Sequence, residues 1–147
     1  MSARSGWLFA LGLKAETFAF ARCIPEEIKV VKNTGVKGVV VEIPASDHMI
    51  KYAYGWSFDR AMKSSIDTTL AAKEAGLYTV FFTIDATRTE LNRFLDIVSQ
   101  VATEGHMDAL TIADTMGVVT PEAISAVVPK VIDRLKKPVE IHCHQDF

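Results

Sequence analysis

Two of the four histidines in this sequence, His142 and His144, are separated by a single residue near the end of the chain. Residues i and i+2 of a β-strand point to the same face, so these two side chains would leave a strand about 6–7 Å apart. That spacing allows both imidazole rings to bind one divalent metal ion. Asp146 continues the same alternation, whereas Cys143 points to the opposite face and is expected to pack outward under helices.

Polar residues also follow several other apolar runs of the sequence. Each of them could equally be a loop start, a helix cap or a solvated charge, and the residues alone leave these interpretations open. The candidates are Arg22 after "FAFA", Ser46 and His48 after "VVVEIP", Asp85 and Arg88 after "VFFTI", and Asp114 and Thr115 after "ALTIA". His106 instead precedes an apolar run, and we interpret it as a structural residue at the opposite edge of the fold.

The composition is that of a globular protein. The chain has 147 residues, 49% of them hydrophobic and 23% charged, which fits one ordinary domain with a buried core. A net charge of −2 without a long run of Lys or Arg argues against nucleic acid or an anionic membrane as a partner. No apolar run reaches the ~18–20 residues of a membrane helix, and we expect a cytoplasmic protein whose two cysteines are reduced.

Strand-like and helix-like segments alternate along the chain. The runs "GVVVEIP", "YTVFFTID" and "ALTIAD" are almost continuously apolar, which is typical of parallel strands covered on both faces. Helix signals lie between them, including Pro25, a Ser57 N-cap and a capping box over 87–90 that opens a helix ending near Gly105. Thr120 opens the last helix. The predicted strands are 16–22, 38–44, 78–85, 109–114 and 139–144.

This alternation predicts a parallel α/β fold. An open doubly wound sheet would usually carry a Gly-rich phosphate loop after its first strand, and none follows here. A (β/α)₈ TIM barrel fits better, because the candidate residues follow one strand after another at the carboxyl ends. Only about five βα units are present, so we expect the middle part of a barrel. Residues 14–147 would form this central part of the catalytic domain, and residues 1–13 are an uncertain N-terminal segment.

Three motifs, "DATR" at 85–88, "ADTMGVVTP" at 113–121 and "HCHQDF" at 142–147, occur in this order. Their combination and spacing resemble the family of metal-dependent barrel enzymes that includes 2-isopropylmalate synthase, homocitrate synthase and 3-hydroxy-3-methylglutaryl-CoA lyase. The resemblance spans about residues 14–147. It implies a divalent ion, Mg²⁺, Mn²⁺ or Zn²⁺, and Claisen-type carbon–carbon bond formation between an acyl-CoA and an α-keto acid.

The resemblance also implies roles for single residues. His142 and His144 match the metal ligands, Thr115 matches the threonine that contacts the substrate carboxylate, and Arg88 matches the arginine that follows the family's acidic pair. We expect Thr115, Arg88 and Asp85 to be the catalytic residues. Ser46 and His48 match a substrate-binding loop, to which we add Arg22. Two alternatives remain: cleavage of the lyase type, and a degenerate domain that binds a carboxylate without catalysis.

The chain departs from the family pattern in three ways. Ile84 stands where the family has the Glu of a Glu-Asp pair, Gln145 replaces an Asn, and the first-strand Arg-Asp motif that supplies another metal ligand has no counterpart. We therefore expect the chain alone to be inactive. A partial barrel also exposes strand edges and an apolar face, which favours a homo-oligomer.

Overall fold

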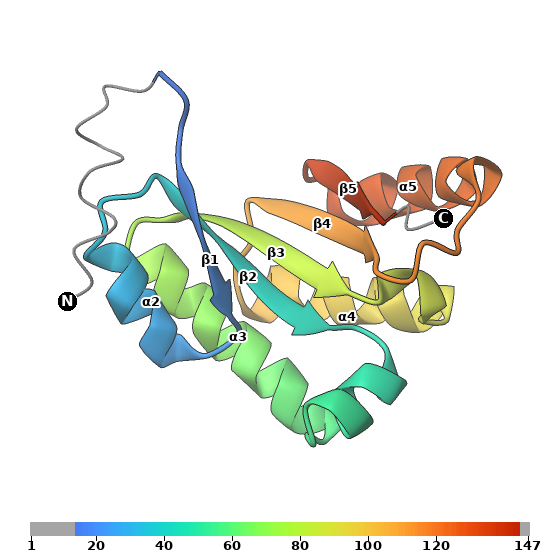
Figure 1. The fold of residues 1–147 in the computed structure, drawn as a ribbon, viewed down its shortest axis with the longest axis horizontal. Coiled ribbons are helices and arrows are strands. Elements are labelled where there is room, and N and C mark those ends of the chain that lie inside the picture. Colours follow the sequence, from blue (N-terminus) through green and yellow to red (C-terminus); the bar gives the residue numbers. More distant parts are fainter. Residues whose placement is uncertain (1–13, 145–147) are drawn as a thin grey trace.

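The computed structural model describes residues 14–144, and five parallel strands form a single sheet in the order β1-β2-β3-β4-β5 (Figure 1). Sequence order and spatial order coincide, as in a parallel barrel in which each strand is added beside the one before it. The predictions for residues 1–13, Gln145 and Asp146 lie outside the described residues.

All five predicted strands are confirmed, with small changes at their ends. The strands are β1 (Phe18–Arg22), β2 (Gly38–Pro44), β3 (Tyr78–Ile84), β4 (Ala109–Asp114) and β5 (Val139–Cys143). The first strand begins two residues later than predicted, where Phe18 pairs with Gly38. The third ends one residue earlier, because Asp85 adopts a left-handed backbone conformation with φ 58° that breaks the extended chain.

The helices between the strands are α2 (Pro25–Lys32), α3 (Phe58–Glu74), α4 (Leu91–Glu104) and α5 (Pro121–Leu135), with a π-helical turn at Met49–Ala53 and a 3₁₀ turn at Ala86–Arg88. Ser57 and Thr120 cap α3 and α5 as predicted, each accepting a backbone N–H with its hydroxyl. The predicted capping box at 87–90 is wrong. Helix α4 starts at Leu91, because the Glu90 carboxylate itself accepts the N–H groups of Asn92 and Arg93.

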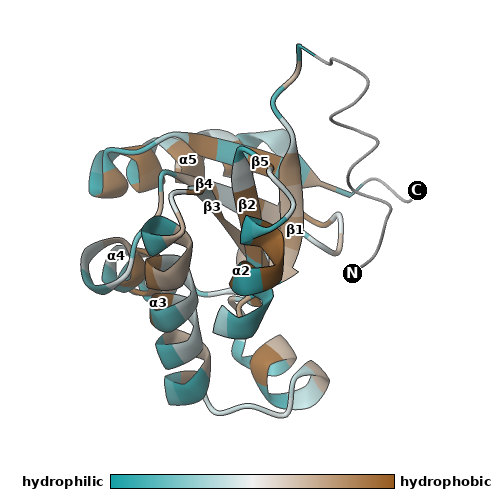
Figure 2. Cartoon of the chain, turned by 90° about the vertical axis from the view of Figure 1, so that its left-hand side faces the viewer, coloured by the Kyte–Doolittle hydropathy of each residue, from teal (hydrophilic) through white to brown (hydrophobic). Residues whose placement is uncertain are grey.

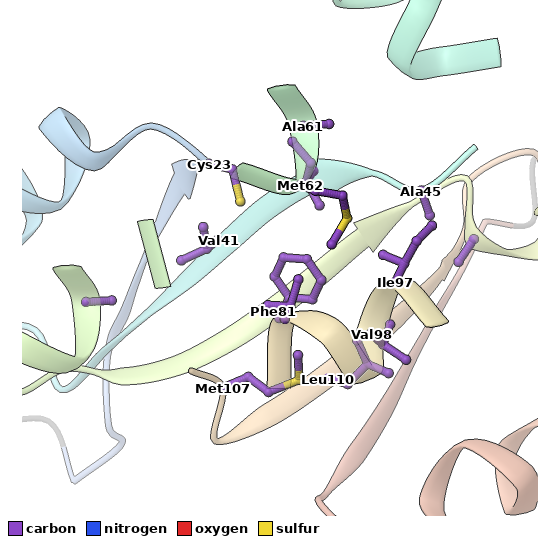
Figure 3. Packing of buried hydrophobic residues seen from close by; sticks show 14 of the residues in the cluster. Cys23, Val41, Ala45, Ala61, Met62, Phe81, Ile97, Val98, Met107 and Leu110 are labelled. Atoms are coloured by element: carbon purple, nitrogen blue, oxygen red, sulfur yellow. The ribbon is translucent and has the colours of Figure 1, made fainter. Parts of the chain in front are cut away.

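The core lies between the sheet and helices α2, α3 and α4, which run along one side of it (Figure 1). Alternate strand residues point to this side, among them Val41 and Phe81, which are fully buried. Phe81 packs centrally among Met62, Ile97 and Leu110 from α3, α4 and β4 (Figure 3). Figure 2 shows brown segments in the strands and alternating teal and brown along the helices, as expected for helices with one buried side.

The opposite side of the sheet, here called the inner face, carries no helix from residues 14–144. Strand register places Phe20 and Val40 in one row of this face, and Arg22, Glu42, Phe82, Thr111 and Glu140 in the next. Phe20 is 60% exposed and Phe18 38% exposed. In a barrel this face would point to the interior.

Cys143 lies on the helix side of β5 but is exposed, so the expectation that it packs under helices is wrong. Val131 is the buried residue of α5, which packs beside α4 and β5. Within residues 14–144 no helix is long and apolar enough to cross a membrane.

Candidate functional site

The two histidines converge at the carboxyl edge of the sheet. His142 lies near the end of β5 on the inner face and His144 follows the strand, so that their Nε2 atoms are 3.2 Å apart. The His142 ring also contacts the edge of Phe82 from β3, with 5.5 Å between ring centroids. The side chains therefore share one face, as the i, i+2 spacing predicts.

The separation of the two Nε2 atoms suits a shared metal ion. Two nitrogen atoms 3.2 Å apart, each about 2.1 Å from one ion, subtend an angle of about 100° at that ion. This angle lies between those of tetrahedral and octahedral sites. Residues 14–144 contain no cluster of three or more His, Cys, Asp or Glu side chains that could hold a metal. The pair thus fits part of a metal site and leaves the other coordination positions to water, substrate or other ligands.

The turn after β4 holds His144 in place. The His144 N–H donates to the Asp114 carbonyl at 3.3 Å, and a Cβ at Gly117 would come within 2.7 Å of the His144 carbonyl oxygen. Gly117 also has φ +61°, a conformation that other residues rarely adopt. The glycine of the "ADTMG" motif is therefore required by close approach of the histidine segment, a role that the sequence alone did not reveal.

Asp114 is buried at the centre of this turn. Its carboxylate accepts the Thr87 hydroxyl at 2.7 Å and the Val119 N–H at 3.0 Å. Burial raises the pKa of Asp114, but the hydrogen bonds from Thr87, Val119 and Val118 together with the nearby His144 outweigh it, so the pKa lies below its usual value. The ionised carboxylate thus links the turns after β3 and β4, and the backbone carbonyl of Asp114 links them to His144 after β5.

We expect Asp114→Asn to lower the free energy of unfolding at pH 7 by about 1–3 kcal/mol, because charged hydrogen bonds in a buried site are lost. A carboxyl whose folded pKa is lowered stabilises the fold above its unfolded pKa of about 4, and this contribution disappears as pH falls through the folded pKa. Urea unfolding of both proteins between pH 7 and pH 3 should therefore show a difference that shrinks below about pH 4. Asp96→Asn, an exposed change on α4, is the control. A difference independent of pH would contradict this role for the charge.

Asp85 connects the ends of three strands. It is fully buried, and its carboxylate accepts the Ser46 hydroxyl at 2.5 Å and the Arg88 guanidinium at 2.6 Å and 2.7 Å. The Asp85 N–H donates to the Thr115 hydroxyl oxygen at 2.7 Å. A non-glycine residue with positive φ stores strain, and such residues cluster at functional sites.

These hydrogen bonds show which of the candidate residues after β2, β3 and β4 can still bind a ligand. Both carboxylate oxygens of Asp85 are occupied by Ser46 and Arg88, and the Ser46 oxygen also accepts the Met49 N–H at 3.2 Å. Asp85 and Ser46 are therefore placed to position other groups. Thr115 accepts a hydrogen bond with its oxygen, so its own proton can be donated to a ligand.

A hollow of about 400 Å³ opens beside Asp85 at the same edge. Its lining includes Ser46, His48, Arg88 and Arg93. The His48 ring is exposed and lies 5.0 Å from that of Tyr52 on the π-helical turn. Arg93 pairs with Asp47 at 2.7 Å. The structure thus brings Ser46, His48 and Arg88 together around one opening.

Arg22 lies at the end of β1, away from that hollow. Its guanidinium donates to Glu27 of α2 at 2.7 Å, and its side chain is 62% exposed. The neighbouring strand carries Glu42, which the sequence did not single out. Burial raises the pKa of this carboxyl, and the Tyr54 hydroxyl donates to it at 3.4 Å. The two-residue period of side-chain direction in a strand was the signal that places Glu42 on the inner face.

A second hollow, of about 380 Å³, lies on the inner face next to His142. Phe20, Val40 and Phe82 line its apolar part, and Thr111 and Glu140 line its polar part. The Thr111 hydroxyl donates to the Glu140 carboxylate at 2.8 Å. His106 lies at the other end of the sheet, where it contacts Asp108 before β4, as predicted for a structural residue.

Comparisons with known proteins identify the family and the fold of this chain. A family model described as HMGL-like matches residues 8–147. The CimA protein of Archaeoglobus fulgidus, a predicted (R)-citramalate synthase, is 35% identical over 137 residues, which are 92% of this chain and 28% of that protein. Homocitrate synthase AksA of Methanopyrus kandleri is 32% identical over 136 residues, 92% of this chain and 34% of that protein. The chain thus spans about a third of the length of these relatives.

Among solved structures, the HMG-CoA lyase of Bacillus subtilis superposes with a TM-score of 0.77 at 16% identity, covering 97% of this chain and 51% of that one. The hydroxymethylglutaryl-CoA lyase of Pseudomonas aeruginosa superposes with the same TM-score of 0.77, covering 98% and 50%. At such low identity the likeness concerns the fold. It confirms the predicted partial TIM barrel.

Proposed function

Because this chain belongs to the HMGL-like family, we propose that it forms the metal-binding edge of an enzyme that condenses an acyl-CoA with an α-keto acid. The observation that carries the proposal is the convergence of His142 and His144, with Nε2 atoms 3.2 Å apart, at the edge where Thr115 and Arg88 also lie. The relatives at 32–35% identity, named as citramalate and homocitrate synthases, favour condensation.

In this reaction the α-carbon of the acyl thioester gives up a proton and attacks the keto carbon of the acid. The keto oxygen takes up a proton and becomes a hydroxyl, and water then cleaves the thioester to release the CoA thiol. A divalent ion held by His142 and His144 would act as a Lewis acid that offsets negative charge on the substrate oxygens.

The other residues of the edge bind and orient the keto acid in this proposal. Thr115 donates its hydroxyl proton to the substrate carboxylate, because its oxygen already accepts the Asp85 N–H. Arg88 is held through Nε and Nη2 by Asp85, which fixes the direction of its remaining guanidinium nitrogen toward an anionic substrate group. Ser46 completes the support by donating to the same carboxylate.

The proposal is tested in a chimera, in which this chain replaces the matching third of M. kandleri homocitrate synthase. We expect thiol release from acetyl-CoA that depends on both a divalent ion and one of pyruvate, 2-oxoisovalerate or 2-oxoglutarate. The 147-residue chain alone should release no thiol, since two histidines leave most of the ion's coordination unfilled.

Three other outcomes of the assay would contradict the proposal. Formation of acetyl-CoA from 3-hydroxy-3-methylglutaryl-CoA without thiol release would show cleavage of the lyase type. A folded chimera that binds the keto acid and converts nothing would show a carboxylate-binding domain. Thiol release that persists in a chimera with His142→Ala and His144→Ala would show that the site is misplaced.

A further inference from the structure

A further cavity, of about 130 Å³, lies between α4 and α5. It is bounded by the first turns of both helices, by β4 and by the turns that follow β3 and β4. Its lining comes from residues 86–127, well inside the described part of the chain. The larger apolar side chains around it are Leu91 and Phe94 of α4, Ile112 of β4, and Ile124 and Val127 of α5.

The lining of this cavity offers water few hydrogen-bond partners. None of the described residues around it has a charged side chain, and the polar ones are Thr87 and Thr89. The Thr87 hydroxyl donates to the Asp114 carboxylate at 2.7 Å, and the Thr89 hydroxyl donates to the Asp85 carbonyl at 3.3 Å. A buried water needs about three polar partners, and apolar cavities without them stay dry. The cavity therefore suits an uncharged apolar occupant.

The volume of the cavity sets the size of that occupant. In another protein, an apolar cavity of about 150 Å³ lined by Leu, Ile and Phe binds benzene or xenon. Well-packed interiors seldom contain voids much larger than a water molecule, because the side chains around an unfilled void lose contacts. A small hydrocarbon in the cavity between α4 and α5 therefore gains contacts that the protein itself leaves unmade.

We propose that this cavity binds a small neutral apolar molecule of about the size of benzene, and that the bound molecule stabilises the turn after β4. Val119 and Thr87 line the cavity, and both donate to the Asp114 carboxylate. The carbonyl oxygen of Asp114 accepts the His144 N–H. A ligand in the cavity thus packs against the two residues that hold Asp114 in place. The site does not depend on the condensation proposed above.

Titration of benzene into the 147-residue chain tests the site. We expect saturable binding with a Kd on the order of 1 mM, and a rise in Tm of about 3–5 °C at about ten times that concentration. In proton–nitrogen NMR spectra the backbone signals of Val119 and Phe94 should shift, whereas the signal of Val31 on α2 should not. Benzoate has a similar ring but carries a charge, so it should produce neither effect.

A filling variant and two controls locate the bound benzene. Ala123→Leu fills the cavity, because Ala123 belongs to its lining on α5, and this variant should abolish the rise in Tm. Leucine is a good helix former, so the far-UV circular dichroism spectrum should not change. Ala126→Leu, on the same helix but outside the lining, should bind benzene like the unmodified chain. Phe20→Ser, which removes an exposed ring of the inner face, should also leave binding unchanged.

Binding that Ala123→Leu abolishes and that both controls retain supports the proposal. A chain that shows neither a rise in Tm nor shifted signals would overturn it, because the cavity would then admit no ligand. Binding that Phe20→Ser abolishes would place benzene on the inner face and would overturn it as well. Val127→Phe fills the cavity from the next turn of α5 and decides the question if Ala123→Leu does not fold. Binding that survives both filling variants would mean that the ligand lies elsewhere, against the proposal.

Discussion

Replacing His142 or His144 with alanine is expected to reduce the affinity for Zn²⁺ at least about tenfold, and replacing both should abolish specific binding. The two Nε2 atoms are 3.2 Å apart, a separation at which one ion can contact both. Imidazole suits Zn²⁺ better than Mg²⁺, so Zn²⁺ is the sensitive probe for a site to which residues 14–144 contribute two histidine ligands. Calorimetric titration of the four proteins measures the effect.

The chain offers a matched control for this experiment. His106 lies at the opposite end of the sheet beside Asp108, so His106→Ala removes a histidine without touching the carboxyl edge. We expect Zn²⁺ binding by this variant to equal that of the unmodified chain. Equal losses in His106→Ala and His142→Ala would mean that the ion binds histidines without preference, and the convergence at β5 would then have no bearing on metal binding.

Phe81→Ala is expected to lower the free energy of unfolding by about 3–5 kcal/mol, which is a large part of the stability of a typical domain. Phe81 is fully buried, and its ring is surrounded by residues of β4, α3 and α4 (Figure 3). Truncation removes the apolar contacts and leaves a cavity at a place where sheet and helices meet, so the surroundings cannot easily close it. Urea unfolding followed by circular dichroism measures the change.

Tyr52→Ala is the control for aromatic truncation, because Tyr52 is 69% exposed on the π-helical turn. Its effect should stay within about 0.5 kcal/mol. A loss of less than about 1 kcal/mol for Phe81→Ala would contradict the description of this residue as the centre of the core.

The secondary structure was largely predictable because local signals and burial agree. One face of β2, β3 and β4 packs against helices, and the other is the inner face of a partial barrel. Most residues on both faces are apolar, so these runs lack the alternation of a half-exposed strand. Ser57 and Thr120 act as caps because a hydroxyl at that position satisfies a free N–H group wherever the helix lies. The start of α4 was mispredicted because Thr87 bonds to Asp114, 27 residues away.

The sequence by itself determined the parallel βα order, the carboxyl-edge position of the candidate residues and the shared face of His142 and His144, since these follow from strand period and strand direction. Only the tertiary structure decided which groups meet. The buried Asp85 joins Ser46, Arg88 and Thr115, and Gly117 makes room for the backbone of His144. Such contacts join loops that are distant in sequence, and their partners depend on how neighbouring strands pack rather than on any local pattern. Burial likewise depends on neighbours: Cys143 stays exposed although the strand period places it on the helix side.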